Sequence, residues 1–300
     1  MTRIGAVYNP YENPPEALRG AVEAAEAAGV PELWIWEDCF RESAFATAAA
    51  ALAWTERLHL GIGIAPMPLR NVAATAMEVA TIERTFPGRL HPGVGHGVLS
   101  WMAQVGAKVA SPLTLMRECV PALRALLAGE EVTVAGRYVT LDHVRLDWPP
   151  GAAPPVYAAG EGPRTLALAG EVADGVILTG SRTPAEFGEQ IRHVREGGVG
   201  VARESMPAVV AYVVAAFGDG AEQRVRSSSG ELGATGERGV WGDVSEVTAG
   251  VQRFADAGVD AVVLVPADGE GDLASFLRSV GEVARNLGGS GPHGVGGVGR

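Results

Sequence analysis

The sequence predicts an α/β protein that folds as a closed (β/α)8 TIM barrel. Short apolar segments of strand length alternate with segments of helical periodicity almost from end to end. Eight strand segments with helices after them favour a closed parallel barrel over an open sheet. The 300 residues exceed a typical domain of about 100–200 but suit a one-domain barrel. We therefore expect one barrel over residues 1–287, a hairpin insertion after the fourth strand, and a disordered glycine-rich tail over residues 288–300.

The composition excludes several classes of protein. The chain carries 24 Lys and Arg against 35 Asp and Glu, a formal net charge of −11, so no nucleic acid is expected as a partner. Its two cysteines, Cys39 and Cys119, do not make the disulfide framework of a secreted protein. No signal-peptide pattern and no apolar stretch near the ~20 residues that cross a bilayer is present. We expect a cytoplasmic homodimer that binds a small-molecule substrate and no membrane.

The first half of the chain contains four predicted strands, at residues 3–7, 33–36, 58–64 and 89–93. Predicted helices alternate with them, at residues 13–29, 43–55 and 71–84. The first helix has Asn13 as its candidate cap, Pro14 in the first position and Glu16 three residues past the cap. This spacing predicts a capping box at the start of that helix, and Gly29 provides its end.

The second half contains the hairpin and four more strands. A helix over 113–128 precedes the hairpin, which is predicted at 132–139 with its turn at Ala135–Gly136. The later strands are expected at 156–159, 175–179, 209–217 and 259–265, and the last helix over 273–287. Thr183 and Glu186 have the spacing of a second capping box. The glycine-rich stretch 227–242 is interpreted as a mobile loop after the seventh strand.

Two candidate catalytic residues follow predicted strands, because the active site of a barrel lies at the carboxyl ends of its strands. Asp38 ends the second strand, where a carboxylate is costly unless it is hydrogen-bonded or functional. The alternative is that Asp38 or Glu37 caps the next helix. His96, which follows Gly95 after the fourth strand, is a candidate proton donor, or else an ordinary polar loop residue.

The loop after the fifth strand is a candidate anion site. Glycines let the backbone approach a ligand closely, and the N–H groups at a helix start attract anions. The alternative is a tight turn with no ligand. Metal-binding and other catalytic motifs are absent and the six histidines are scattered, so no metal is expected. The candidate binding residues of this loop and its helix are Ala159, Gly160, Glu161, Gly162 and Arg164.

Several segments, taken in order and spacing, resemble the luciferase-like monooxygenase superfamily of flavin- and deazaflavin-dependent barrels. The segments are 60–66 with 70–71, 73–84, 88–97, 132–138, 155–162 and 173–176. The resemblance implies a flavin across the strand ends, with its ring over the third strand and its phosphate near the fifth loop. In similar deazaflavin enzymes a non-prolyl cis peptide ends the third strand, which here is the Gly63–Ile64 bond. The cofactor-binding residues it implies are Asp38, Gly63, Ile64, Ala65 and Gly95.

The sequence departs from the family pattern at two positions. Cys39 follows Asp38 where many F420-dependent relatives have a histidine, and Val98 stands where some relatives place a glutamate. The whole pattern is closer to the F420 branch, so we expect a coenzyme F420-dependent oxidoreductase that transfers a hydride to or from a small organic substrate. The alternatives are an FMN-dependent monooxygenase using reduced flavin and oxygen, or a non-catalytic flavin-binding barrel. Arg70 and Arg164 are the expected partners of the anionic F420 tail.

Overall fold

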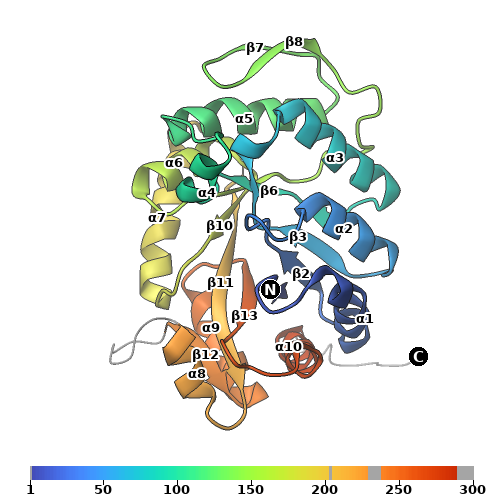
Figure 1. The fold of residues 1–300 in the computed structure, drawn as a ribbon. Helices are drawn as coiled ribbons and strands as arrows, with labels where there is room; N and C mark the ends of the chain where they lie inside the picture. The colour runs from blue at the N-terminus through green and yellow to red at the C-terminus, as the bar shows by residue number, and fades with distance from the viewer. Residues whose placement is uncertain (1, 203–204, 229–237, 289–300) are drawn as a thin grey trace, which may run out of the picture.

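The computed structural model describes residues 2–202, 205–228 and 238–288, and it shows parallel strands surrounded by helices (Figure 1). The strands of the main sheet within these residues are β1 (Arg3–Tyr8), β2 (Glu32–Ile35), β3 (His59–Ile62), β4 (Ala65–Pro66), β5 (Leu90–His91), β6 (Gly93–Gly95), β9 (Tyr157–Ala159), β10 (Gly175–Leu178), β11 (Ala208–Phe217), β12 (Gly239–Gly242) and β13 (Ala261–Pro266). The helices are α1 (Leu18–Ala28), α2 (Ala44–Ala53), α3 (Val72–Thr85), α4 (Leu99–Gln104), α5 (Pro112–Leu127), α6 (Pro163–Val172), α7 (Pro184–Gly200), α8 (Ala221–Ser228), α9 (Val244–Asp256) and α10 (Leu273–Gly288).

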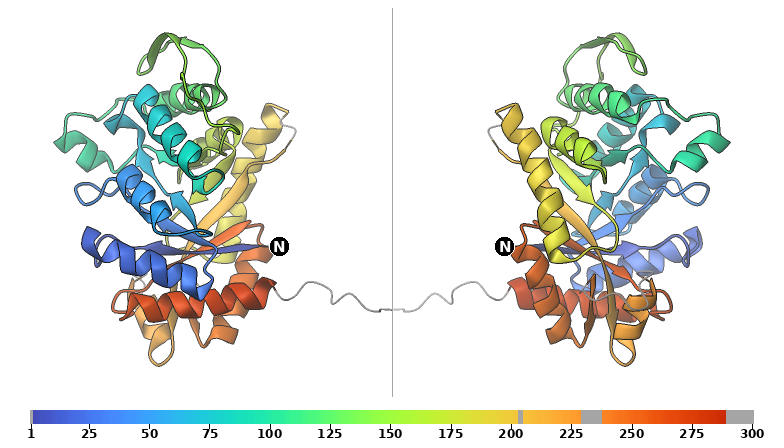
Figure 2. Two further views of the ribbon diagram at one scale, coloured as in Figure 1. Left: turned by 90° about the vertical axis from the view of Figure 1, so that its right-hand side faces the viewer. Right: turned by 90° about the vertical axis from the view of Figure 1, so that its left-hand side faces the viewer.

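The strands close into a ring, which confirms the predicted fold class. Strands β3 and β4 form one interrupted barrel strand, and β5 and β6 form the next one. Strand β3 pairs with β5, β4 pairs with β6, and β6 pairs with β9. From β9 the parallel pairing continues through β10, β11 and β13 to β1, which pairs with β2. Helix α10 lies beside α1, so the outer layer of helices also comes back to its start (Figures 1 and 2).

The hairpin insertion is present, but its second arm begins later than predicted. Strand β7 (Val132–Ala135) pairs with β8 (Thr140–Val144), whereas residues 137–139 were expected to form the second arm. The carboxylate of Glu118 on α5 accepts the backbone N–H groups of Arg137, Tyr138 and Val139. These residues therefore bond to the helix beneath the hairpin, and strand pairing starts only at Thr140. The hairpin projects beyond the helices at one end of the molecule (Figure 2).

The prediction of a mobile loop over residues 227–242 is wrong at both ends of this range. Helix α8 continues to Ser228, and Gly239–Gly242 forms β12, while residues 229–237 lie outside the described residues. Strand β12 exists because β11 has ten residues and extends past the end of β10, so its outer half is open to pairing with β12. The tail was expected to begin at residue 288, but Gly288 is the last residue of α10. Residues 289–300 lie outside the described residues.

The helix ends were predicted with mixed success. Gly29 ends α1 in a left-handed conformation, with φ 77°, and Thr183 and Glu186 form the predicted capping box of α7. The capping box at Asn13 is wrong, because the Asn13 side chain donates to the carbonyl of Asn9 and Pro14 is the N-cap residue. Within the described residues, no helix combines the length and apolarity needed to cross a membrane.

Aromatic side chains fill the inside of the barrel. The ring of Trp34 meets the rings of Tyr157 and Tyr212 edge-on, with centroids 5.9 and 6.0 Å apart. Glycines on the surrounding strands make room for them, since a Cβ built on Gly61 would overlap the Trp34 indole and one on Gly175 would overlap the Tyr157 ring. The barrel is thus a packed core, closed beneath the carboxyl ends of its strands.

We predict that Gly61→Ala destabilises the protein by roughly 1–3 kcal/mol or more, because the new methyl group has no space beside Trp34. Gly20→Ala on α1 is the matched control, since a Cβ there has no heavy atom within 4 Å. It should raise the free energy of unfolding by up to ~1 kcal/mol, because glycine is a poor helix residue. Urea denaturation of both variants measures the difference, and equal effects would contradict the packing described here.

Candidate active site

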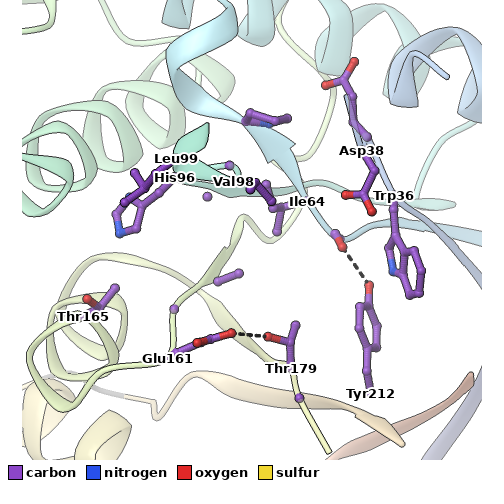
Figure 3. A pocket seen from close by; sticks show the side chains of 18 of the residues that line it. Trp36, Asp38, Ile64, His96, Val98, Leu99, Glu161, Thr165, Thr179 and Tyr212 are labelled. Atoms are coloured by element: carbon purple, nitrogen blue, oxygen red, sulfur yellow. Dashed lines mark hydrogen bonds between the residues drawn. The ribbon is translucent and has the colours of Figure 1, made fainter. Parts of the chain in front are cut away.

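A cavity of about 750 Å³ opens at the carboxyl ends of the barrel strands (Figure 3). Its volume lies within the ~300–1,000 Å³ of typical small-molecule sites. Except for Ala65, Arg70 and Arg164, the residues predicted to bind or catalyse all line it. They come from the ends of β2, β3, β6 and β9, so the barrel collects segments that are far apart in the sequence. Ala65 is buried in β4, directly after the cavity-lining Ile64.

The floor of the cavity lies at the break between β3 and β4. The Gly63–Ile64 peptide is cis, as the family resemblance implies, and Cys39–Phe40 is a second non-prolyl cis bond. The hydroxyl of Tyr212 on β11 donates to the carbonyl of Gly63 across 3.3 Å. Burial raises the pKa of Tyr212, so this hydroxyl stays protonated and serves as a donor. A side chain at position 63 would overlap that hydroxyl, which explains the glycine there.

Asp38 lies on one side of Ile64, next to Trp36 (Figure 3). Its Oδ2 accepts a hydrogen bond of 2.8 Å from the hydroxyl of Tyr11, and the guanidinium of Arg41 covers the Tyr11 ring at 3.9 Å from the centroid. Burial raises the pKa of the Asp38 carboxyl, while the Tyr11 hydrogen bond and the charge of Arg41 oppose the rise. Tyr11 is thus a partner of the site that sequence reasoning missed.

Glu37 has the structural role that the alternative interpretation gave it. Its carboxylate forms two hydrogen bonds of 2.6 Å with the Arg70 guanidinium and accepts the backbone N–H of Ala44 at the start of α2. Arg70 also pairs with Glu78 through its Nε, at 3.2 Å. Arg70 is therefore held between two carboxylates and does not line the cavity, so it is not placed to meet an anionic ligand there.

His96 lies across the cavity from Asp38, beside Val98 and Leu99 (Figure 3). Burial lowers the pKa of its imidazole, which is therefore neutral at pH 7. Its Nδ1 is buried and has no hydrogen-bond partner within the described part of the chain. A buried polar atom without a partner is costly, and this nitrogen has almost no surface exposed to the cavity.

The loop after β9 forms another side of the cavity. Gly160, Glu161 and Gly162 line it, and the hydroxyl of Thr179 donates to Glu161 at 3.4 Å. Helix α6 starts directly afterwards, and its N-cap residue Gly162 provides no side-chain cap for the first N–H groups. Gly160 also has a local role, because a Cβ there would overlap the side chain of Thr165.

The cation near this loop is different from the one predicted. Arg164 lines a separate depression on the outer surface, together with Arg117 and Glu171. Arg182 instead lies beside the cavity, next to Gly180, which lines it. A Cβ built on Gly180 would be 3.7 Å from the Nε of Arg182. That Nε is buried and unpartnered within the described residues. Sequence reasoning missed this arginine.

These features define a barrel whose small-molecule cavity is lined by Asp38 and His96 among other titratable groups, with Arg182 beside it. The family model described as luciferase-like monooxygenase matches residues 1–236, so the chain belongs to this family of flavin- or F420-dependent oxidoreductases. Among the residues described, no cluster of three or more His, Cys, Asp or Glu side chains is suited to a metal ion.

Two curated relatives illustrate the sequence similarity. The chain is 30% identical over 173 residues to a 5,10-methylenetetrahydromethanopterin reductase of Methanolobus tindarius, covering 58% of this chain and 52% of that protein. It is 30% identical over 194 residues to an F420-dependent glucose-6-phosphate dehydrogenase of Beutenbergia cavernae, covering 61% and 58%. The chain thus matches little more than half of each relative's length.

Solved structures extend the similarity in fold to nearly the whole chain. The coenzyme F420-dependent tetrahydromethanopterin reductase of Methanopyrus kandleri has a TM-score of 0.79 at 20% identity, over 93% of this chain and 97% of that one. An F420-dependent secondary alcohol dehydrogenase in complex with an F420–acetone adduct has a TM-score of 0.78 at 22% identity, over 94% and 97%. The oxygenating constituent of 3,6-diketocamphane monooxygenase from Pseudomonas putida, in complex with FMN, scores 0.76 at 15% identity, over 96% and 98%.

We predict that Tyr11→Phe raises the pKa of Asp38 further. The hydroxyl of Tyr11 stabilises the charged carboxylate by donating to it, so its loss favours the protonated form. Carbon-13 NMR titration of the Asp38 carboxyl measures the change. Tyr138→Phe is the control, since its hydroxyl accepts from Ser111 outside the cavity lining and its loss should leave Asp38 unchanged. An Asp38 pKa that is the same in Tyr11→Phe and the parent protein would contradict this assignment.

Proposed function

We propose that this protein is a coenzyme F420-dependent oxidoreductase that transfers a hydride between the deazaflavin and a small organic substrate. The observation that carries the proposal is the different chemistry of two parts of the cavity. The part at residues 160–162 and 180 combines backbone groups, a helix N-terminus and the neighbouring Arg182 with the carboxylate of Glu161. The part at residues 96–101 combines a neutral imidazole with apolar side chains.

The first part fits the anionic portion of such a cofactor. Arg182 does not line the cavity, but its guanidinium lies near Gly180, which does, so its positive charge favours an anion in this part. The N–H groups of the first turn of α6 carry a partial positive charge and also favour an anion. A Cβ added to Gly162 would meet no heavy atom within 4 Å, so there is open space in front of this helix start. Gly162 and the start of α6 would thus hold the phosphate-bearing part, with the charge of Arg182 acting from outside the cavity lining.

Besides a site for the cofactor, the reaction needs a group that transfers a proton to or from the substrate. F420, when bound, would carry the hydride in this reaction. Asp38 and His96 are the candidates for proton transfer, because both line the cavity and both have pKa values shifted by burial. The raised pKa of Asp38 keeps its protonated form available at higher pH than in water, and the lowered pKa of His96 keeps the imidazole neutral. The cavity therefore offers both an acid and a base.

The relatives support F420 as the cofactor. The Beutenbergia cavernae relative and two of the structural neighbours are F420-dependent by name. The second candidate is an FMN-dependent monooxygenase, favoured by the FMN-containing neighbour from Pseudomonas putida. Cys39 and Val98, at positions where relatives have a histidine or a glutamate, are compatible with a non-catalytic barrel as a third candidate.

A homodimer stays a prediction that sedimentation of the purified protein would test.

We predict that the purified protein binds F420 more tightly than FMN in parallel fluorescence titrations. Gly162→Val should weaken F420 binding by about tenfold or more, because the added side chain enters the space before α6. Gly20→Val on α1 is the matched control, since position 20 is equally open but does not line the cavity, and its affinity should equal that of the parent protein.

The same titrations separate the candidates. Tight FMN binding with weak F420 binding would overturn the proposal in favour of the monooxygenase. Retained F420 without hydride transfer to any member of a broad substrate panel would favour the non-catalytic barrel. If neither cofactor binds, the similarity is one of fold alone.

A further inference from the structure

The charges around the cavity bear on which substrate fits it. The residues that line the cavity within the described part of the chain include no lysine and no arginine. Three acidic residues line it, of which Glu37 is paired with Arg70 through two hydrogen bonds of 2.6 Å. Within the described residues, Asp38 and Glu161 have no basic side chain as a hydrogen-bonding partner, and the charge of Arg41 acts on Asp38 without a hydrogen bond. Arg182, which lies beside the cavity at Gly180, is the neighbouring cation in the part assigned above to the cofactor phosphate.

The part of the cavity at residues 96–101 is apolar, unlike the part at residues 160–162 and 180 that is assigned above to the cofactor phosphate. Val98 and Leu99 are 44% and 49% exposed although both are large and apolar, and Trp101 lines the cavity with them. Their position is firmly held, since Met102 on α4 is buried and a Cβ built on Gly97 would be 2.9 Å from Pro66 and 3.2 Å from Met102. Apolar side chains held open to a cavity favour a ligand that covers them with apolar surface.

An anionic substrate would be disfavoured at this wall. Moving a carboxylate or phosphate out of water costs free energy unless a cation or several donors replace the water. The described wall offers the neutral His96 imidazole and apolar side chains, and no cation that would replace the lost water. An uncharged carbonyl or hydroxyl compound needs one hydrogen-bonding partner, and the imidazole of His96, which lines the cavity, can be that partner.

We infer that the substrate is an uncharged, predominantly apolar organic molecule, held against Val98, Leu99 and Trp101, and that carboxylated and phosphorylated compounds are excluded. This inference rests on the proposed function for the identity of the site, but it concerns the binding of substrate and not the cofactor. It separates this chain from its relative named for glucose-6-phosphate, since no described lining side chain would neutralise a sugar phosphate at this wall.

Two ring ketones of nearly equal size test the inference. The probes are 4-isopropylcyclohexanone and 4-oxocyclohexanecarboxylate, which differ mainly in charge. Dissociation constants are measured by ligand-observed NMR on the protein alone and on the protein saturated with F420. We expect the uncharged ketone to bind about tenfold or more tightly than the carboxylate in both forms. Equal binding, tighter binding of the carboxylate, or no binding of either probe would overturn the inference.

A pair of charge-introducing variants locates the effect. Leu99→Arg places a cation at the wall and should strengthen carboxylate binding while weakening the uncharged ketone. Val105→Arg is the matched control, because Val105 is similarly exposed, at 47%, but does not line the cavity, so the preference should stay that of the parent protein. The same response in both variants would overturn the placement at this wall. Failure to bind F420 would refute the proposed function alone, because the comparison of ketones is also made on the protein without cofactor.

Discussion

The packing of Trp34 inside the barrel is the constraint on which the rest of the structure depends. The indole lies where Gly61 has no side chain, and its Nε1 donates to Glu32 at 3.1 Å. Glu32 is buried and pairs with Arg3 at 3.0 Å, which offsets part of the cost of burying its charge. Tyr212 packs against Trp34 and reaches upward to the carbonyl of Gly63. The aromatic core therefore supports the floor of the cavity directly, so a change deep in the barrel is expected to reach the site.

The fold was predictable because its signals are local and repeated. Alternation of apolar strands with helical periodicity, together with caps such as Thr183 and Gly29, is visible in one sequence. Two of the errors arose where a distant residue decides the outcome. Glu118 on α5 takes the backbone N–H groups of the hairpin turn, and the outer half of β11 provides the pairing edge for β12. Neither interaction leaves a pattern near the segment that it controls.

The candidate site was predictable in its location and less so in its charges. Barrel topology puts the strand ends together, so Asp38, His96 and Gly160 were expected to share one cavity, and they do. Whether a charged side chain faces that cavity depends on helix phase and on competing partners, which spacing does not reveal. Arg164, in the first turn of α6, faces outward, Arg70 is held by two carboxylates, and Arg182 lies beside the cavity instead.

Hydrogen–deuterium exchange with and without F420 tests the central claim most directly, because it locates the bound cofactor without requiring turnover. The claim predicts slower exchange on addition of F420 at residues 63–66, 95–99 and 160–166. The opposite mouth of the barrel, at residues 87–88 and 150–155, should be unaffected, although it also contains a depression. Protection at that opposite mouth, or protection nowhere at saturating F420, would contradict the claim that the cavity above Gly63–Ile64 is the cofactor site.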